Sequence, residues 1–161
     1  MNRRLAVAVC LVLAGISLTS LATRGQVTER PADAELAGLD QKVKDFLGRI
    51  SFESDIQSAY QELLKNSQPL TQTEALNALV QKTRLIRERY GEVRDFEQIS
   101  ARRVGKDLVL LRYLYKCENY PVVWHVTFYR TTKQNEVPRN SDWTVVTVRF
   151  DTNVEILALG I

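Results

Sequence analysis

The hydrophobic repeat of the chain changes its period at Gly91. Before this residue, apolar side chains recur at steps of three and four, which is typical of amphipathic helices. After it, apolar and polar residues alternate, which is typical of β-strands with one buried face. Helices followed by strands predict an α+β domain with an antiparallel sheet, because successive strands are joined by short connections.

Three helices are predicted in the first half of the chain. The first spans residues 36–47, and the second begins near Ser54 and stops at Asn66. The third is the clearest, because Thr71 and Glu74 have the spacing of a capping box at its start. The apolar stripe of this third helix consists of Leu76, Leu79, Val80, Thr83, Ile86 and Tyr90. Its other side, rich in Lys and Arg, is interpreted as a solvated face.

Four strands are predicted at residues 93–104, 108–115, 122–131 and 143–151, with a polar loop at 132–142 before the last. Short turns between such strands predict a four-stranded meander. An antiparallel sheet of this kind is twisted, and one of its faces has to be covered. We therefore expect the three helices to pack on one face of a curved sheet.

Alternation along each strand divides the side chains between two faces. In the third strand, Trp124 belongs to the apolar set that faces the helices, whereas His125 faces the other way. In the fourth strand, the same alternation places Val146 on the helix side and Trp143 on the other side. Exposed Trp, Tyr and Arg side chains are the types that anchor protein interfaces. The predicted interface on the uncovered face consists of His125, Thr127, Tyr129, Trp143, Thr147 and Arg149.

The first residues have the composition of an export signal. Arg3 and Arg4 precede the apolar run 5–16, and small residues lead to a cleavage site after Ala22. The apolar run is shorter than the ~20 residues of a spanning helix, so an uncleaved anchor is the less favoured alternative. The predicted organisation is a signal peptide at 1–22, a flexible leader at 23–35 and a single domain at 36–161, in a secreted or periplasmic protein.

Removal of this signal changes the charge of the chain. The signal carries two of the 22 basic residues and no acidic residue, which leaves 20 basic residues against 19 acidic ones. Nucleic-acid-binding domains usually carry a clear basic excess on one face. We therefore expect neither a nucleic-acid partner nor stable membrane insertion of the mature domain.

The reactive residue types are too few to build a metal or catalytic site. His125 is the single histidine, and Cys117 is the one cysteine outside the signal. Zinc sites draw several ligands from Cys, His or carboxylate side chains, and no nucleophile motif accompanies the histidine. Arg112 and Lys116 point to the opposite face of their strand from Cys117, so a packed thiol is favoured over a reactive one. No catalytic residue, metal or cofactor is predicted.

Tyrosines on the strands leave two interpretations open. Tyr113 and Tyr115, with His125 and Tyr129, are candidates to bind a small apolar ligand inside a bent sheet, because such pockets combine apolar walls with a few polar groups. Core packing, with the hydroxyl groups at the rim, is the alternative for the tyrosines. Alternation places the tyrosines of the second strand together on one face.

The order of elements resembles the NTF2-like, cystatin-like cone superfamily. The likeness covers about residues 36–157 and rests on the Tyr90-Gly91 helix end and on the last strand, which runs from Trp143 to Phe150. The resemblance implies a cone-shaped α+β fold shared by isomerase-like enzymes, transport factors and non-catalytic accessory domains. Enzymes of that superfamily use a carboxylate base and a tyrosine, but no aspartate here matches that role, so no site residue is carried over.

Three functions remain as hypotheses. The first is a non-catalytic binding or accessory domain that holds a small apolar ligand or a protein partner in the cone pocket or on the open sheet face. The second is an isomerase-like enzyme or ligand carrier with tyrosine hydroxyl groups in the pocket. The third is a structural module that forms a homodimer through its sheet.

Overall fold

The computed structural model describes residues 31–53, 55–67, 70–131 and 143–155. The predicted signal peptide and the polar loop 132–142 lie outside the described residues. The elements follow in the order α1 (Pro31–Gly48), η1 (Arg49–Glu53), α2 (Ile56–Leu63), α3 (Thr73–Tyr90), β1 (Val93–Val104), β2 (Leu108–Cys117), β3 (Pro121–Arg130) and β4 (Trp143–Asp151). This confirms the predicted α+β class. Within the described part of the chain, no helix is long and apolar enough to cross a membrane.

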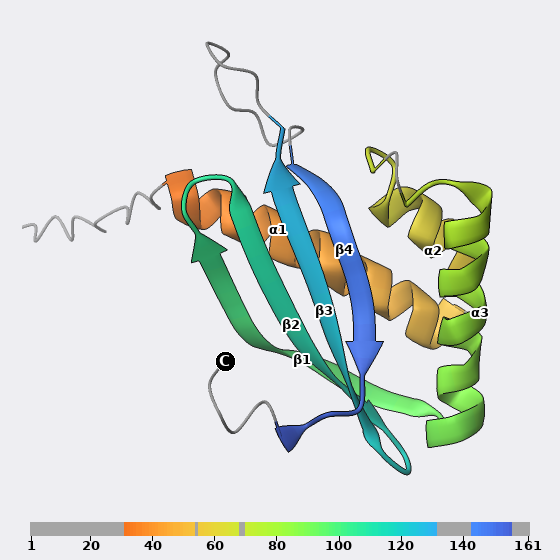
Figure 1. Ribbon diagram of the computed structural model, residues 1–161. Helices are drawn as coiled ribbons and strands as arrows, with labels where there is room; N and C mark the ends of the chain where they lie inside the picture. Colours follow the sequence, from red (N-terminus) through yellow and green to blue (C-terminus); the bar gives the residue numbers. More distant parts are fainter. Residues whose placement is uncertain (1–30, 54, 68–69, 132–142, 156–161) are drawn as a thin grey trace, which may run out of the picture.

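The sheet is an antiparallel meander with the strand order β1-β2-β3-β4, as predicted. Figure 1 shows α1 crossing one face of all four strands, while α2 and α3 stand beside β4. The other face carries none of the labelled helices, and it is called the open face below. Because successive side chains of a strand point to opposite faces, each strand sends one set towards α1 and the other set to the open face.

Trp124 of β3 is the centre of the core. Its side chain is fully buried and makes edge contacts with Phe46 of α1 and Tyr115 of β2, at ring-centroid distances of 5.6 and 6.0 Å. Phe150 of β4 lies 4.8 Å away on the same basis. Full burial of one large apolar side chain contributes roughly 1.5–3 kcal/mol. Aromatic packing between α1 and three adjacent strands therefore supplies much of the stability of the domain.

Both ends of α3 are explained by local hydrogen bonds. Gly91 ends the helix, as predicted, with a φ of +85° that favours glycine. The predicted capping box at the start is wrong, because the N-cap is Gln72 and its side chain makes no capping bond. The backbone N–H of Thr71 instead donates to the carbonyl of Ser67 at 3.0 Å. Thr71 therefore belongs to the preceding turn, and the helix begins after it.

The ends of α1 also differ from the prediction. The leader was expected to reach residue 35, but α1 begins at Pro31. The carboxylate of Glu35 explains the order of this turn, because it accepts hydrogen bonds from Arg103 at 3.0 Å and Arg130 at 2.7 Å. At the other end, α1 stops at Gly48, one residue beyond the predicted range, and the chain continues directly into the π-helical turn η1.

A β-bulge in β4 reverses the predicted orientation of Trp143. Val145 and Thr147 pair with two adjacent residues of β3, so Val146 between them has no partner. The extra residue shifts the alternation before it, so that Trp143 faces α1 and is 3% exposed, whereas Val146 is 45% exposed. The assignment of Trp143 to the open face is therefore wrong. Its ring packs under the guanidinium of Arg130, 4.5 Å from the ring centroid.

Substitution of Glu35 tests the ion pairs that it forms with Arg103 and Arg130. The Glu35→Gln variant removes the anion that two partly buried guanidinium groups share, so we expect the free energy of unfolding to fall by about 2 kcal/mol. Urea denaturation measures this change. Glu88→Gln, at an exposed position of α3, is the matched control, and equal midpoints for the two variants would contradict the assignment.

Candidate functional site

A row of basic and imidazole side chains crosses the open face. The antiparallel register places Arg112 of β2 opposite His125 of β3, and His125 opposite Arg149 of β4. Directly opposite side chains in such a ladder have their Cβ atoms roughly 4.5–5.5 Å apart. The imidazole is therefore flanked by two guanidinium-bearing side chains on the same face.

His125 is held neutral in this row. Its Nε2 atom lies 3.2 Å from a carboxylate oxygen of Asp151, and its side chain is 12% exposed. Burial lowers the pKa of His125 below its usual 6.5, and the charges of Arg149 and Arg112 lower it further, whereas Asp151 acts in the opposite direction. At neutral pH the imidazole therefore donates a hydrogen bond to Asp151 and adds no charge to the row.

Apolar side chains are exposed further along the same face, four residues along β2 and β3 from this row. Val104, Tyr129 and Val146 are 44, 46 and 45% exposed. The register links the first two through Leu108, which pairs with Val104 on one side and with Tyr129 on the other. Tyr129 and Val146 line the same surface hollow. The open face therefore carries both apolar surface and arginine side chains, with Thr127 and Thr147 between them.

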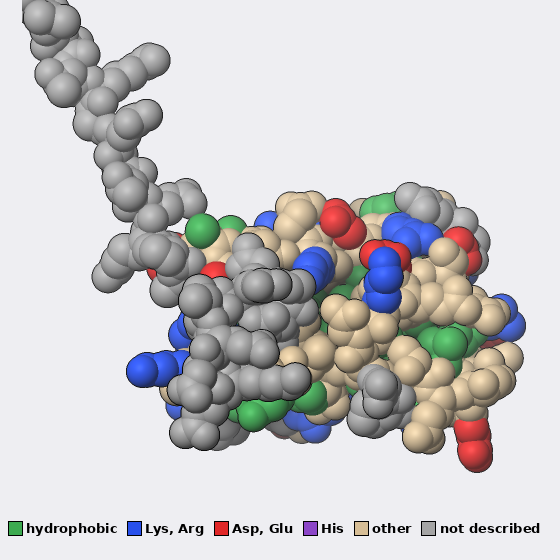
Figure 2. Space-filling model, turned by 90° about the horizontal axis from the view of Figure 1, so that it is seen from above, with side chains coloured by type: hydrophobic (Ala, Val, Ile, Leu, Met, Phe, Trp, Pro, Cys, Tyr) green, Lys and Arg blue, Asp and Glu red, His purple; other side chains and the backbone are tan. Residues whose placement is uncertain are grey.

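In the part of the chain that the structure describes, no group of three or more His, Cys, Asp or Glu side chains is placed to hold a metal ion. No family model, curated protein or solved structure matches this chain. Figure 2 shows Lys and Arg side chains interspersed with Asp and Glu side chains on the end of the molecule seen from above, without a single basic field.

Tyr113 and Tyr115 lie on the helix side of β2 and are 0 and 2% exposed. The hydroxyl of Tyr113 donates to the carboxylate of Asp40 in α1, and that of Tyr115 is hydrogen-bonded to Ser51 Oγ at 2.7 Å. Burial is the main cause that raises the pKa of Tyr115 to about 12 and raises that of Tyr113 as well. Both hydroxyl groups are therefore engaged within the protein.

The four predicted ligand-binding residues are not brought together. Tyr113 and Tyr115 face the helices, whereas His125 and Tyr129 lie on the open face. The register pairs Tyr113 with Trp124 and Tyr115 with Val122, which face the helices. His125 and Tyr129 occupy the alternate positions of β3 and therefore point to the other face of the sheet. Of the predicted interface residues, Thr147 and Arg149 are exposed beside Tyr129 and His125. The polar surface predicted for the open face is thus present, without Trp143.

The π-helical turn η1 was not predicted. Its Ser51 is 4% exposed and connects three elements. The hydroxyl donates to the carbonyl of Leu47 and contacts the hydroxyl of Tyr115, while the carbonyl accepts from Arg87 of α3 at 2.9 Å. These partners are far apart in sequence, and no local pattern indicates them. Single π turns are frequent at functional sites, and a hollow of about 320 Å³ opens here between η1, α3 and β1.

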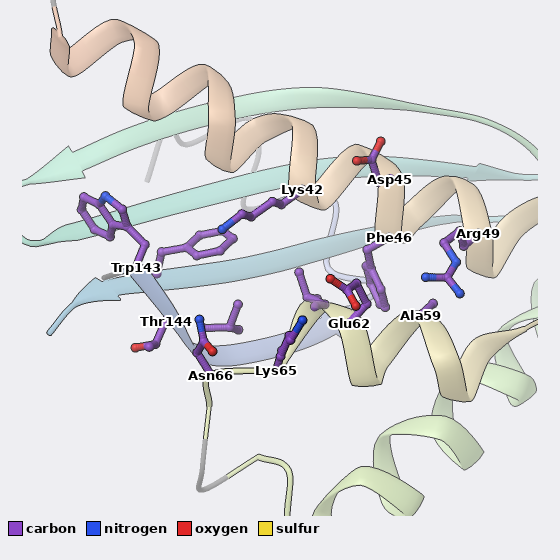
Figure 3. Close-up of a pocket in the computed structure, with 13 residues that line it drawn as sticks. Lys42, Asp45, Phe46, Arg49, Ala59, Glu62, Lys65, Asn66, Trp143 and Thr144 are labelled. Carbon is purple, nitrogen blue, oxygen red and sulfur yellow. The ribbon is translucent and has the colours of Figure 1, made fainter. Parts of the chain in front are cut away.

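A second feature that the sequence did not reveal is a groove between α1, α2 and the start of β4 (Figure 3). Lys42 and Asp45 of α1 line it on one side, and Glu62 of α2 and Lys65 of the following turn line it on the other. Its volume is about 210 Å³, below the ~300–1,000 Å³ of typical ligand pockets. Basic and acidic side chains are mixed in its lining, with Lys42, Arg49 and Lys65 against Asp45 and Glu62.

Cys117 is partly buried at the end of β2. Loss of solvent raises the pKa of its thiol to about 11, so the reactive thiolate form is scarce at neutral pH. The ammonium of Lys116 lies within 3.2 Å of Asp95 and 3.1 Å of Glu97 instead. These contacts agree with the expectation of a packed and unreactive cysteine.

The single histidine permits a direct test of the electrostatics. We expect an NMR titration to give a pKa below 6.5 for His125, which Arg149→Gln raises and Asp151→Asn lowers further. The unfolded chain binds this proton more readily, so the neutral imidazole stabilises the fold above pH 6.5 and that contribution is lost as the pH falls.

Lys106→Gln, in the exposed turn between β1 and β2, is the control for the loss of a positive charge and should leave the titration unchanged. A higher pKa in Asp151→Asn than in the wild type would disprove the pairing.

Proposed function

We propose that this chain is an exported, non-catalytic binding domain that attaches to a protein partner through its open face. The observation that carries the proposal is the exposed apolar set Val104, Tyr129 and Val146 on the same face as Arg112 and Arg149. Aromatic and arginine side chains with apolar neighbours are the groups that dominate binding energy at interfaces. Uncovered apolar surface of this kind marks interaction sites on soluble domains.

The packing of the core favours a protein partner over a small ligand inside the fold. Trp124 fills the space between α1 and the sheet, and the hydroxyl groups of Tyr113 and Tyr115 are bonded to Asp40 and Ser51. A ligand carrier or an isomerase-like enzyme needs these groups to face a cavity. Tyr115 lines the hollow of about 320 Å³ at η1, where its hydroxyl is bonded to Ser51. A ligand carrier at that hollow is therefore the second candidate.

The long helix α1 across a twisted antiparallel meander supports the further proposal of an NTF2-like, cystatin-like cone. In that superfamily, by resemblance, sheets also pair between two copies. The partner on the open face is then either a different protein or a second copy of this chain, which the size of a captured complex distinguishes.

Site-specific photo-crosslinking tests the open face. With p-benzoylphenylalanine in place of Tyr129, we expect a discrete crosslinked product in a host that exports the protein, because an interface residue lies within contact distance of its partner. The same substitution at Phe52, which is 63% exposed on η1, is the matched aromatic control. Products of equal yield at the two positions, or none from position 129, would overturn the proposal.

Export is a separate proposal that follows from the sequence of residues 1–22. We expect the mature protein to begin at Thr23, which intact-mass spectrometry of the exported product measures. Ala22→Arg places a large charged residue at the cleavage site and should block processing. A product that retains Met1 in an exporting host would contradict cleavage.

A further inference from the structure

An apolar groove of about 430 Å³ separates α3 from β4. This volume lies within the range of ligand and peptide pockets, roughly 300–1,000 Å³. Its apolar lining consists of Leu79, Leu85, Ile86 and Tyr90 from α3, and Val148 and Phe150 from β4. Leu85 remains 37% exposed. The groove therefore presents apolar side chains to solvent along the flank of a strand.

That strand is the edge of the sheet. β4 is outermost in the order β1-β2-β3-β4 and pairs only with β3 among the described strands. Every second N–H and C=O group of an edge strand points away from its partner and is available to another strand. The bulge at Val146 lies before the groove, so residues 147–151 form a regular segment next to it.

Positive charge surrounds the groove. Lys82 and Arg89 lie on the α3 side, and Arg149 lies on β4, with no carboxylate in the lining. None of the three forms a salt bridge with another residue of the described ranges. Arg149 pairs with His125 on the open face and also borders the groove. A partner of complementary charge therefore carries acidic groups.

We infer that this groove accepts an extended peptide segment of alternating apolar and acidic residues, which adds to β4 as a fifth strand. Main-chain hydrogen bonds to the edge supply affinity, and alternate side chains supply specificity. One set of side chains covers Val148 and Phe150. The other set points to the opposite face, where an acidic residue beside Arg149 forms a cross-strand pair.

Three independent features converge on this occupant. The unpaired edge requires an extended backbone, the apolar lining requires an apolar residue at alternate positions, and the cations require an acidic partner. A free fatty acid would match the apolar lining and the cations, but it would leave the backbone groups of the β4 edge unpaired. The inference goes beyond the proposed function, because it concerns the edge of the sheet and the flank of α3, and it shares only Arg149 with the open face.

The probe is a capped peptide of about six residues with alternating valine and glutamate, carrying a fluorophore, and binding to the full chain is followed by anisotropy. We expect saturable binding. The same peptide with lysine in place of glutamate should bind at least about tenfold more weakly, because attraction becomes repulsion at three cations. Equal binding of the two peptides, or none of the glutamate peptide, would overturn the inference.

Backbone methylation distinguishes strand addition from simple burial. Two further peptides carry N-methyl groups on alternate residues, one peptide for each parity. Only the parity whose N–H groups point at β4 takes part in the ladder, so methylation of that set should abolish binding and methylation of the other should preserve it. If both N-methylated peptides lose binding, or if neither does, the peptide does not add to β4 as a fifth strand.

Variants of the chain locate the site. Arg149→Gln removes the cation beside the acidic set and should weaken binding of the glutamate peptide about fivefold, whereas Lys106→Gln removes the same charge in the exposed turn between β1 and β2 and should not. Urea midpoints confirm that both variants are folded. Tyr129→Ser, on the open face, should leave peptide binding unchanged, and a loss there equal to that of Arg149→Gln would refute the assignment.

Discussion

The burial of Trp124 between α1 and the sheet is the contact on which the architecture depends. Its indole ring touches Phe46 of α1 and aromatic rings of β2 and β4. A helix that crosses several strands can bury their side chains on one face only, because alternate residues point away from it. The same packing that closes the core therefore leaves Tyr129 and Arg149 of the open face to make contacts elsewhere.

The other end of α1 is fastened by charge rather than by aromatic packing. Glu35 joins Arg103 of β1 to Arg130 of β3, and Arg130 covers the ring of Trp143. The attraction between one carboxylate and two guanidinium groups compensates for the desolvation free energy that their partial burial costs. One cluster thus fixes the first turn of α1, the edge strand β1 and the start of β4, which sets how far α1 can tilt across the sheet.

The sequence predicted the elements whose repeat is long and regular. The bounds of β1 and β4 and the end of α3 at Gly91 follow from alternation and from one glycine. The bulge at Val146 could not be predicted, because a single unpaired residue leaves the apolar pattern intact and reverses only the face of Trp143. The π turn was equally hidden, since Ser51 is held by partners that are distant in sequence.

Alternation along the strands predicted which face of the sheet carries His125, Tyr129, Thr147 and Arg149. It could not predict the groove beside α3. The sequence predicts that Lys82 lies on a solvated helix face, because it does not reveal that β4 lies across a groove from this residue. Arg149 then joins the two surfaces, because its charge lowers the pKa of His125 on the open face while its strand edge borders the groove. An acidic strand at β4 would offset that charge and bring His125 closer to its usual pKa, so occupation of the edge changes the electrostatics of the open face without any movement of the backbone.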